Sequence, residues 1–266
     1  MSEKTLIIDA HIHLYPQADL NQAIAFSLSN MDSARPEKET AKIWLLTERA
    51  DCSAFTQLQE SVRVGIYHII PTREQEALRV QLGERIVLYI IAGRQVVSAD
   101  GLEIGTLASR LRLPDRELET SALIDQALEA GALVTINWAP GKWSGRRKTI
   151  VQSLLAQPPR PGLFIGDSAM RPTFWSEPDL MRKAVSEGWR ILAGSDPLPF
   201  QGEERSFGRY GCMITGEMDP DEPVLTLKRL LAEQQLEPAI WGKRRGTWEF
   251  ARRQFAIMRE KKRRER

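Results

Sequence analysis

The stretch Thr5-Leu-Ile-Ile-Asp9-Ala-His11-Ile-His13 decides the fold. Its first half is a continuous apolar run, which is typical of a buried strand in a parallel sheet. This run leads directly into a His-x-His step. Residues i and i+2 of a strand project to the same side, so His11 and His13 can reach one cation. The sequence therefore predicts a metal site at the end of the first strand.

The rest of the chain alternates apolar strand-like runs with amphipathic helical patterns. Successive β-α units favour an α/β fold, either a parallel barrel or an open parallel sheet. Seven core strands are predicted, near residues 5, 42, 86, 102, 132, 163 and 190. Between residues 62 and 107 the connections are too short for parallel crossovers, so we expect a local antiparallel hairpin elaboration there. Residues 72–82 fit a short helix, and residues 197–222 fit a long loop.

Charge is distributed unevenly along the 266 residues. Residues 242–266 hold eleven Lys or Arg and three Glu, a net charge of +8, whereas the rest has a net charge of −6. We predict a barrel domain over residues 1–241 and a basic C-terminal helix or tail over residues 242–266 that contributes nothing to the site. This tail could contact nucleic acid or a membrane surface, and a solvated terminal helix is the simpler interpretation.

Composition excludes several classes of protein. The hydrophobic content of 42% is too high for general disorder. Two cysteines, Cys52 and Cys212, are too few for a disulfide scaffold. The chain opens on polar residues rather than a signal peptide, and no apolar run approaches the ~20 residues that span a bilayer. We therefore expect a cytoplasmic protein with no membrane span.

Polar residues that can bind metal or transfer protons follow other predicted strands. Because the C-terminal ends of barrel strands open on one face, we expect these residues to lie near His11 and His13. They are Glu48, Asn137, Asp167 and Asp196, with Glu103 inside a further strand. Capping of the following helix is the alternative role of Glu48, Asn137 and Asp167. His68 stands within an apolar run and is interpreted as a core or edge-strand histidine.

Imidazole and carboxylate ligands together suit zinc, manganese or iron, in a number that the sequence leaves open. The loops that follow the later strands carry cations, including Lys142, Arg171 and Arg209. Cations beside a metal suit a small anionic substrate, most simply a phosphate ester. The run from Arg146 to Lys148 can equally be a solvated helix start. Trp138 and Trp143 could line the mouth of the site or stack on a planar substrate group.

Two motifs carry a family resemblance. Asp9-Ala-His11-Ile-His13 and Gly194-Ser-Asp196 resemble the first and last motifs shared by the amidohydrolase superfamily and the PHP (polymerase and histidinol phosphatase) family. The count of seven strands resembles the distorted seven-stranded TIM-like barrel of PHP proteins. The resemblance implies that Glu103 bridges metal ions and that Asp196 shares a role as a base.

The sequence also departs from the PHP pattern. Glu48 stands where PHP proteins have an Asp-His pair, and Asn137 and Asp167 stand where histidines are expected. The resemblance therefore implies either a reduced site of one or two metals, richer in oxygen ligands, or a barrel that has lost catalysis.

Our leading hypothesis is a metal-dependent hydrolase, a phosphoesterase that acts through a metal-activated water. His11, His13 and Asp196 would hold the metal, with Glu103 and Asp167 completing or bridging the site. Lys142, Arg171 and Arg209 would stabilise charge on the phosphoryl oxygens. The alternatives are an amidohydrolase-type enzyme that cleaves C–N bonds and a non-enzymatic barrel that acts as a binding or scaffold protein.

Overall fold

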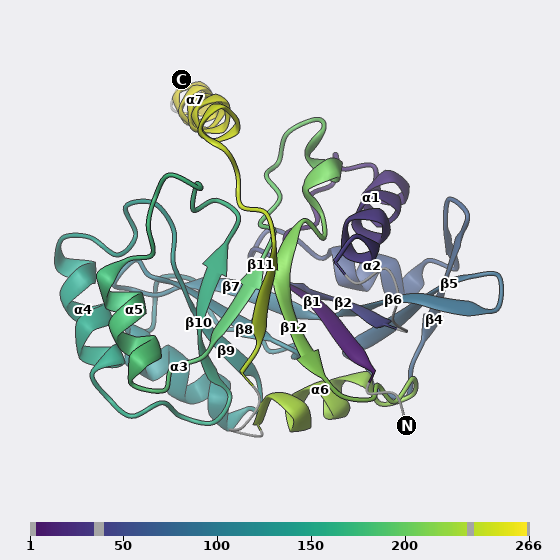
Figure 1. Cartoon of the computed structure of the whole chain (residues 1–266), viewed down its shortest axis with the longest axis horizontal. Coiled ribbons are helices and arrows are strands. Elements are labelled where there is room, and N and C mark those ends of the chain that lie inside the picture. Colours follow the sequence, from purple (N-terminus) through teal and green to yellow (C-terminus); the bar gives the residue numbers. More distant parts are fainter. Residues whose placement is uncertain (1–3, 35–39, 233–236, 265–266) are drawn as a thin grey trace.

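Two mixed β-sheets form the centre of the protein in the computed structural model, which describes residues 4–34, 40–232 and 237–264 (Figure 1). The larger sheet has eight strands, in the order β13 (Ala239–Gly242), β12 (Tyr210–Thr215), β1 (Thr5–Ile12), β2 (Thr40–Leu46), β6 (Arg85–Ile91), β5 (Ala77–Leu82), β4 (Tyr67–Pro71) and β3 (Arg63–Val64). Strands β1, β2 and β6 are parallel, and every other pairing in this sheet is antiparallel.

The smaller sheet has five strands, in the order β11 (Ile191–Gly194), β10 (Leu163–Ser168), β9 (Leu133–Asn137), β8 (Glu103–Leu107) and β7 (Gly93–Val97). Strands β9, β10 and β11 are parallel, while β7 and β8 form an antiparallel hairpin. The seven predicted strands correspond to β1, β2, β6, β8, β9, β10 and β11. The antiparallel elaboration expected between residues 62 and 107 is also present.

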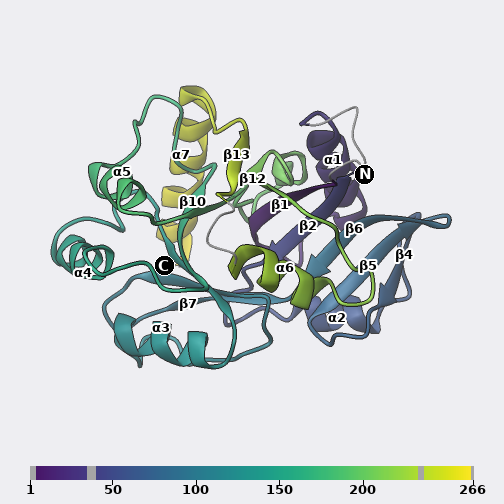
Figure 2. The ribbon, with the colours of Figure 1, turned by 60° about the horizontal axis from the view of Figure 1, so that its bottom comes forward.

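Helices surround these sheets (Figures 1 and 2), and in Figure 1 the last of them, α7 (Thr247–Arg264), projects from the top of the molecule. The others are α1 (Leu20–Asp32), α2 (Ala54–Glu60), α3 (Thr120–Glu129), α4 (Arg146–Leu155), α5 (Asp179–Ser186) and α6 (Pro223–Ala232), with a short 3-10 helix η1 (Glu203–Ser206). No helix among the described residues is long and apolar enough to cross a membrane.

Strand β1 separates two hydrophobic cores. All eight of its residues are buried. Because alternate side chains point to opposite faces, Leu6 and Ile8 enter one core, while Ile7 enters the other, beneath α1. A register shift between Asp9 and Ile12 brings Ile12 into this second core as well. The first core receives side chains from both sheets and is covered at one end by α6, which lies along the base of the molecule in Figure 1 and in front of the sheets in Figure 2.

The two edge strands of the smaller sheet, β11 and β7, each approach an inner strand of the larger sheet. Strand β11 lies against β1, where the Asp196 amide donates to the His11 carbonyl at 2.9 Å. On the other side, Glu48 and Arg94 form an isolated parallel bridge between the end of β2 and β7. The hydrogen-bonded ladder is not continuous at either place. The described residues therefore form two open sheets, and the closed barrel predicted from the sequence is not found.

Two local predictions were wrong. Residues 77–82 form strand β5 and not a helix, because Ala77, Leu78 and Val80 are buried against neighbouring strands in a pairing with β6. The segment expected to be a long loop contains β12, which pairs with β1. Both strands are antiparallel additions to the parallel β-α units from which the fold was inferred.

Candidate metal centre

Three potential ligands converge at the end of the first core opposite α6. The Nε2 atoms of His11 and His13 lie 3.1 Å apart. The Oδ1 atom of Asp196 lies 3.8 Å from Nε2 of His11 and 3.7 Å from Nε2 of His13. These three atoms lie within 4.8 Å of one another, so one cation can contact all of them.

The backbone explains this convergence. His11 and His13 leave the end of β1 on the same side, as the i, i+2 spacing predicts. Asp196 follows β11, and its backbone has a φ of +50°, a conformation that costs a non-glycine residue free energy. The two strands can approach because β11 ends in glycine: a Cβ at Gly194 would lie 2.2 Å from the backbone nitrogen of His11.

Asp9 links the backbone segments that carry the three potential ligands. Its buried carboxylate accepts hydrogen bonds from the backbone amides of His11 at 3.3 Å, Ser195 at 2.8 Å and Gly208 at 2.9 Å. Burial raises the pKa of Asp9 to about 7, although these hydrogen bonds act in the opposite direction. Asp9 thus connects both ligand-bearing strands with the loop that precedes β12.

The protonation of His13 suits a metal ligand. Burial, and next the charge of His11, lowers its pKa to about 4. The ring is therefore neutral near pH 7, as a coordinating imidazole must be. Its other nitrogen, Nδ1, lies 3.5 Å from the Thr47 hydroxyl, in the position where metal-binding histidines commonly have a hydrogen-bonding partner.

A pocket of about 720 Å³ opens over the three ligands. Glu103 and Lys142 form an ion pair in its wall, with Oε1 and Nζ 2.6 Å apart. Cations from two further loops, Arg49 and Arg116, also line this pocket. Further lining residues include Tyr15, Gln95, Trp138, Met170 and Gln254. The space is large enough for a small-molecule substrate.

Asn137 lies in the same pocket wall. Its amide nitrogen donates to Oε1 of Gln95 at 3.3 Å. Its Oδ1 atom is buried and has no hydrogen-bonding partner among the described residues. Asn137 and Glu103 are therefore near the three ligands, although neither belongs to the group whose atoms converge. Trp143 is buried behind this wall and donates to the Asn137 carbonyl.

Two predicted ligands lie elsewhere. Glu48 accepts a hydrogen bond from the Phe55 amide at 2.7 Å, in the first turn of α2, as the capping alternative predicts. Asp167 is bound by Arg171 and by the Tyr210 hydroxyl. In the structure, neither carboxylate joins the three converging ligands, because each is already occupied by donors from its own neighbourhood.

Two of the predicted substrate-binding cations are also engaged elsewhere. Arg171 is buried and pairs with Asp167. Arg209 pairs with Glu249 of α7 at 2.7 Å and lines a different cavity. Of the three predicted cations, Lys142 faces the pocket. His68 is exposed on β4, near the edge of the larger sheet.

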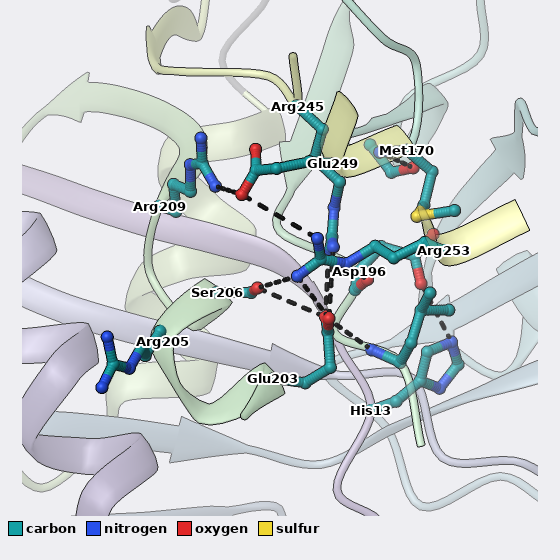
Figure 3. A network of polar contacts seen from close by, with 12 residues as sticks. His13, Met170, Asp196, Glu203, Arg205, Ser206, Arg209, Arg245, Glu249 and Arg253 are labelled. Carbon is teal, nitrogen blue, oxygen red and sulfur yellow. Dashed lines mark hydrogen bonds and ion pairs between the residues drawn. The ribbon is translucent and has the colours of Figure 1, made fainter. Parts of the chain in front are cut away.

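The C-terminal segment is not separate from the site, contrary to our expectation. Gln254 of α7 lines the pocket, and Arg245, 1% exposed, donates to the backbone carbonyl of Asp196. Figure 3 shows Arg245 and Arg253 converging on Glu203 near Asp196 and His13. This contact could not be predicted from the sequence, because Arg245 belongs to a run of basic residues that is typical of a solvated tail.

Comparisons with known proteins identify relatives in fold. No family model and no curated protein gives a significant match. The crystal structure of PsfC from Pseudomonas syringae matches with a TM-score of 0.53 and 14% identity, over 91% of this chain and 93% of PsfC. The lesion-specific endonuclease PfuEndoQ from Pyrococcus furiosus matches with a TM-score of 0.52 and 12% identity, over 88% of this chain and 57% of PfuEndoQ.

A third structure has a lower TM-score of 0.46. It is a two-domain protein from Bacteroides vulgatus that contains a predicted PHP-like metal-dependent phosphoesterase, with 14% identity over 91% of this chain and 66% of that one. At identities of 12–14%, the chain has a fold like that of PsfC and PfuEndoQ.

Proposed function

We propose that this protein is a divalent-metal-dependent hydrolase of the phosphoesterase kind, a divergent relative of the PHP family, acting on a small anionic substrate. The convergence of His11, His13 and Asp196 carries the proposal. Two imidazole rings and a carboxylate fit zinc, manganese or iron. Three protein ligands leave positions open for water and substrate. The two sheets would correspond to the halves of a distorted seven-stranded barrel.

The donor set agrees with a metal rather than with a hydrogen-bond network alone. Nε2 of both histidines points at the same space, and two neutral rings can share only one proton between those nitrogens. A cation in that space would satisfy both lone pairs and the Asp196 carboxylate together. When bound, a divalent ion lowers the pKa of a coordinated water and polarises a phosphoryl oxygen.

The pocket residues would bind and orient the substrate. Lys142 and Arg49 line the pocket and would contact phosphoryl oxygens, where positive charge stabilises the transition state. Glu103, whose Oε1 holds Lys142, fixes the position of that ammonium group. The second carboxylate oxygen of Asp196 would accept a proton. Trp138 excludes water from one wall.

Phosphoester chemistry is favoured over C–N hydrolysis by the cations that line the pocket. The likeness in fold to PfuEndoQ, described as an endonuclease, is in keeping with this choice. The absence of histidine after residue 68 argues for a reduced metal site and is also what a barrel without catalysis would show.

Metal analysis followed by a substrate panel tests the proposal. We expect about one equivalent of a transition metal in the purified protein, lost in His11→Ala, and turnover of phosphoesters after reconstitution with Zn²⁺, Mn²⁺ or Fe²⁺. His68→Ala is the matched control, because that histidine lies on β4 and away from the pocket. Metal content unchanged by His11→Ala would refute the metal site. Activity on amides or lactones alone would select the amidohydrolase-type reaction.

A further inference from the structure

One buried acidic side chain, Glu203 of η1, joins the C-terminal segment to the loop that follows Asp196 (Figure 3). Its carboxylate accepts hydrogen bonds from Arg245 at 3.0 and 3.4 Å and from the backbone amide of Leu198 at 3.2 Å. It also forms an ion pair with Arg253. Two guanidinium groups therefore share one carboxylate in the interior.

Stability alone does not account for this cluster. Transferring three charges out of water is costly, and apolar replacements of buried ion triads can be equally stable or more stable. Nε of both Arg245 and Arg253 is buried without a hydrogen-bonding partner among the described residues. Such a cluster is better explained by the geometry that it fixes than by its contribution to the free energy of unfolding.

Arg245 extends this geometry to the proposed metal centre. Its Nη2 atom donates to the backbone carbonyl of Asp196 at 3.3 Å, while the Asp196 amide donates to the His11 carbonyl. The peptide groups on both sides of Asp196 are thus held in place. This matters because the φ of +50° at Asp196 lies in the left-handed region, which costs a non-glycine residue free energy.

The backbone of Arg245 is itself anchored. Its amide donates to the Ala169 carbonyl at 3.3 Å, and its carbonyl accepts from the Thr173 amide at 2.9 Å. Both partners belong to the segment that follows β10. The backbone of Arg245 is therefore fixed to the segment after β10, and from there its guanidinium group reaches both Asp196 and Glu203.

We infer that Arg245 is a positioning residue that holds Asp196 in its ligand conformation, so that the C-terminal segment is a structural part of the metal site. This inference rests on the proposed function for the ligand role of Asp196. Arg253 provides a matched comparison: it binds the same Glu203 and the Ser206 hydroxyl, but no hydrogen bond or ion pair links it to Asp196 within the described residues.

The experiment compares Arg245→Met with Arg253→Met in the full-length protein, using two measurements. The first is the affinity for Zn²⁺ and Mn²⁺ by isothermal titration calorimetry. Loss of a residue that orients a metal ligand commonly lowers affinity by about 10- to 100-fold. We expect a loss of that size for Arg245→Met and a change of less than about threefold for Arg253→Met.

The second measurement is hydrogen–deuterium exchange at the Asp196 amide in metal-free protein. We expect faster exchange in Arg245→Met, because the support of the Asp196 peptide is lost, and wild-type exchange in Arg253→Met. If Arg245→Met does not fold, as judged by circular dichroism, Arg245→Lys replaces it. The lysine keeps the charge but cannot donate to Asp196 and Glu203 through one planar fork.

The two proposals fail separately. A wild-type protein that binds no metal overturns the proposed function, while hydrogen exchange still decides whether Arg245 supports Asp196. A wild-type protein that binds metal, together with a folded Arg245 variant of equal affinity and unchanged exchange, overturns the inference alone. Equal effects of Arg245→Met and Arg253→Met would assign the cluster a general structural role and would also overturn it.

Discussion

Asp167 and Arg171 form a buried ion pair with two hydrogen bonds. Nε of Arg171 donates to Oδ1 at 2.9 Å, and Nη2 donates to Oδ2 at 2.6 Å. The Tyr210 hydroxyl donates to Oδ2 as well, at 2.8 Å. The sequence assigned Asp167 to the metal and Arg171 to the substrate, but in the structure the two side chains bind each other. The two residues are four apart, with Asp167 near the end of β10 and Arg171 in the loop that follows it, so the pairing is local.

This pairing predicts that Asp167→Asn is a stability variant. Removing one partner leaves the Arg171 guanidinium buried without a counter-charge, which costs about 3–5 kcal/mol of the free energy of unfolding. Metal affinity should stay within about twofold of wild type, because Asp167 is outside the three converging ligands. Urea unfolding and calorimetry with Zn²⁺ check the two values.

Asp196→Asn is the matched control for Asp167→Asn. It should remove most of the metal affinity and have a small effect on unfolding, because the Asp196 side chain faces the pocket. A folded Asp167→Asn protein that no longer binds metal would restore Asp167 as a ligand.

A variant of Glu48 should also change the stability of the fold without changing its affinity for metal. Its Oε1 accepts from the Phe55 amide in the first turn of α2, where a carboxylate also interacts favourably with the helix dipole. Glu48→Ala should lower the free energy of unfolding by about 1 kcal/mol, as loss of a helix cap does, with unchanged metal affinity. A tenfold fall in affinity without loss of stability would contradict this assignment.

The two cysteines should differ in reactivity. Cys212 is fully buried between β1 and β13, and burial raises the pKa of its thiol to about 12. Cys52 is partly exposed, and burial together with Asp51 raises its pKa. At pH 8, iodoacetamide should modify Cys52 slowly and leave Cys212 unmodified until urea unfolds the protein. Mass spectrometry of tryptic peptides measures both, and native labelling of Cys212 would show that this core opens.

The sequence predicted the local part of the candidate site. The spacing of His11 and His13 on one strand fixes their common direction, and the glycine before Asp196 allows β11 to approach β1. Parallel strand ends meet at one edge, so the three residues could be expected together. Glu103, assigned to the site by the family resemblance, and Lys142, assigned as a loop cation, both line the pocket.

The rest of the candidate site could not be predicted, because it depends on which partner each charged side chain binds. A carboxylate after a strand can bind metal, cap a helix or pair with an arginine, and the residue type is the same in all three cases, as Glu48 and Asp167 show. Arg245 contacts Glu203 and Asp196, which are more than forty residues away along the chain. The antiparallel strands β5 and β12 were missed because their pairing is set by neighbours in the sheet rather than by a periodic pattern of their own.

The depressed pKa of His13 predicts how stability depends on pH in metal-free protein. The folded ring remains neutral down to about pH 4, whereas the unfolded ring takes up a proton below about pH 6.5. Between these values the unfolded chain binds more protons, so the stabilisation is complete above pH 6.5 and is lost as pH falls toward 4. The full effect is on the order of 3 kcal/mol.

Asp9 opposes His13 over the same interval, which decides how the measurement must be made. Burial raises the pKa of Asp9 to about 7, so the folded state retains a proton that the unfolded chain releases above about pH 3.8. This group therefore destabilises the fold as pH rises through that range, and the wild-type curve alone is flattened. The difference in unfolding free energy between wild type and His13→Gln isolates the histidine. That difference should fall by about 3 kcal/mol from pH 7 to pH 4, and a constant difference would show that His13 is not held neutral by its surroundings.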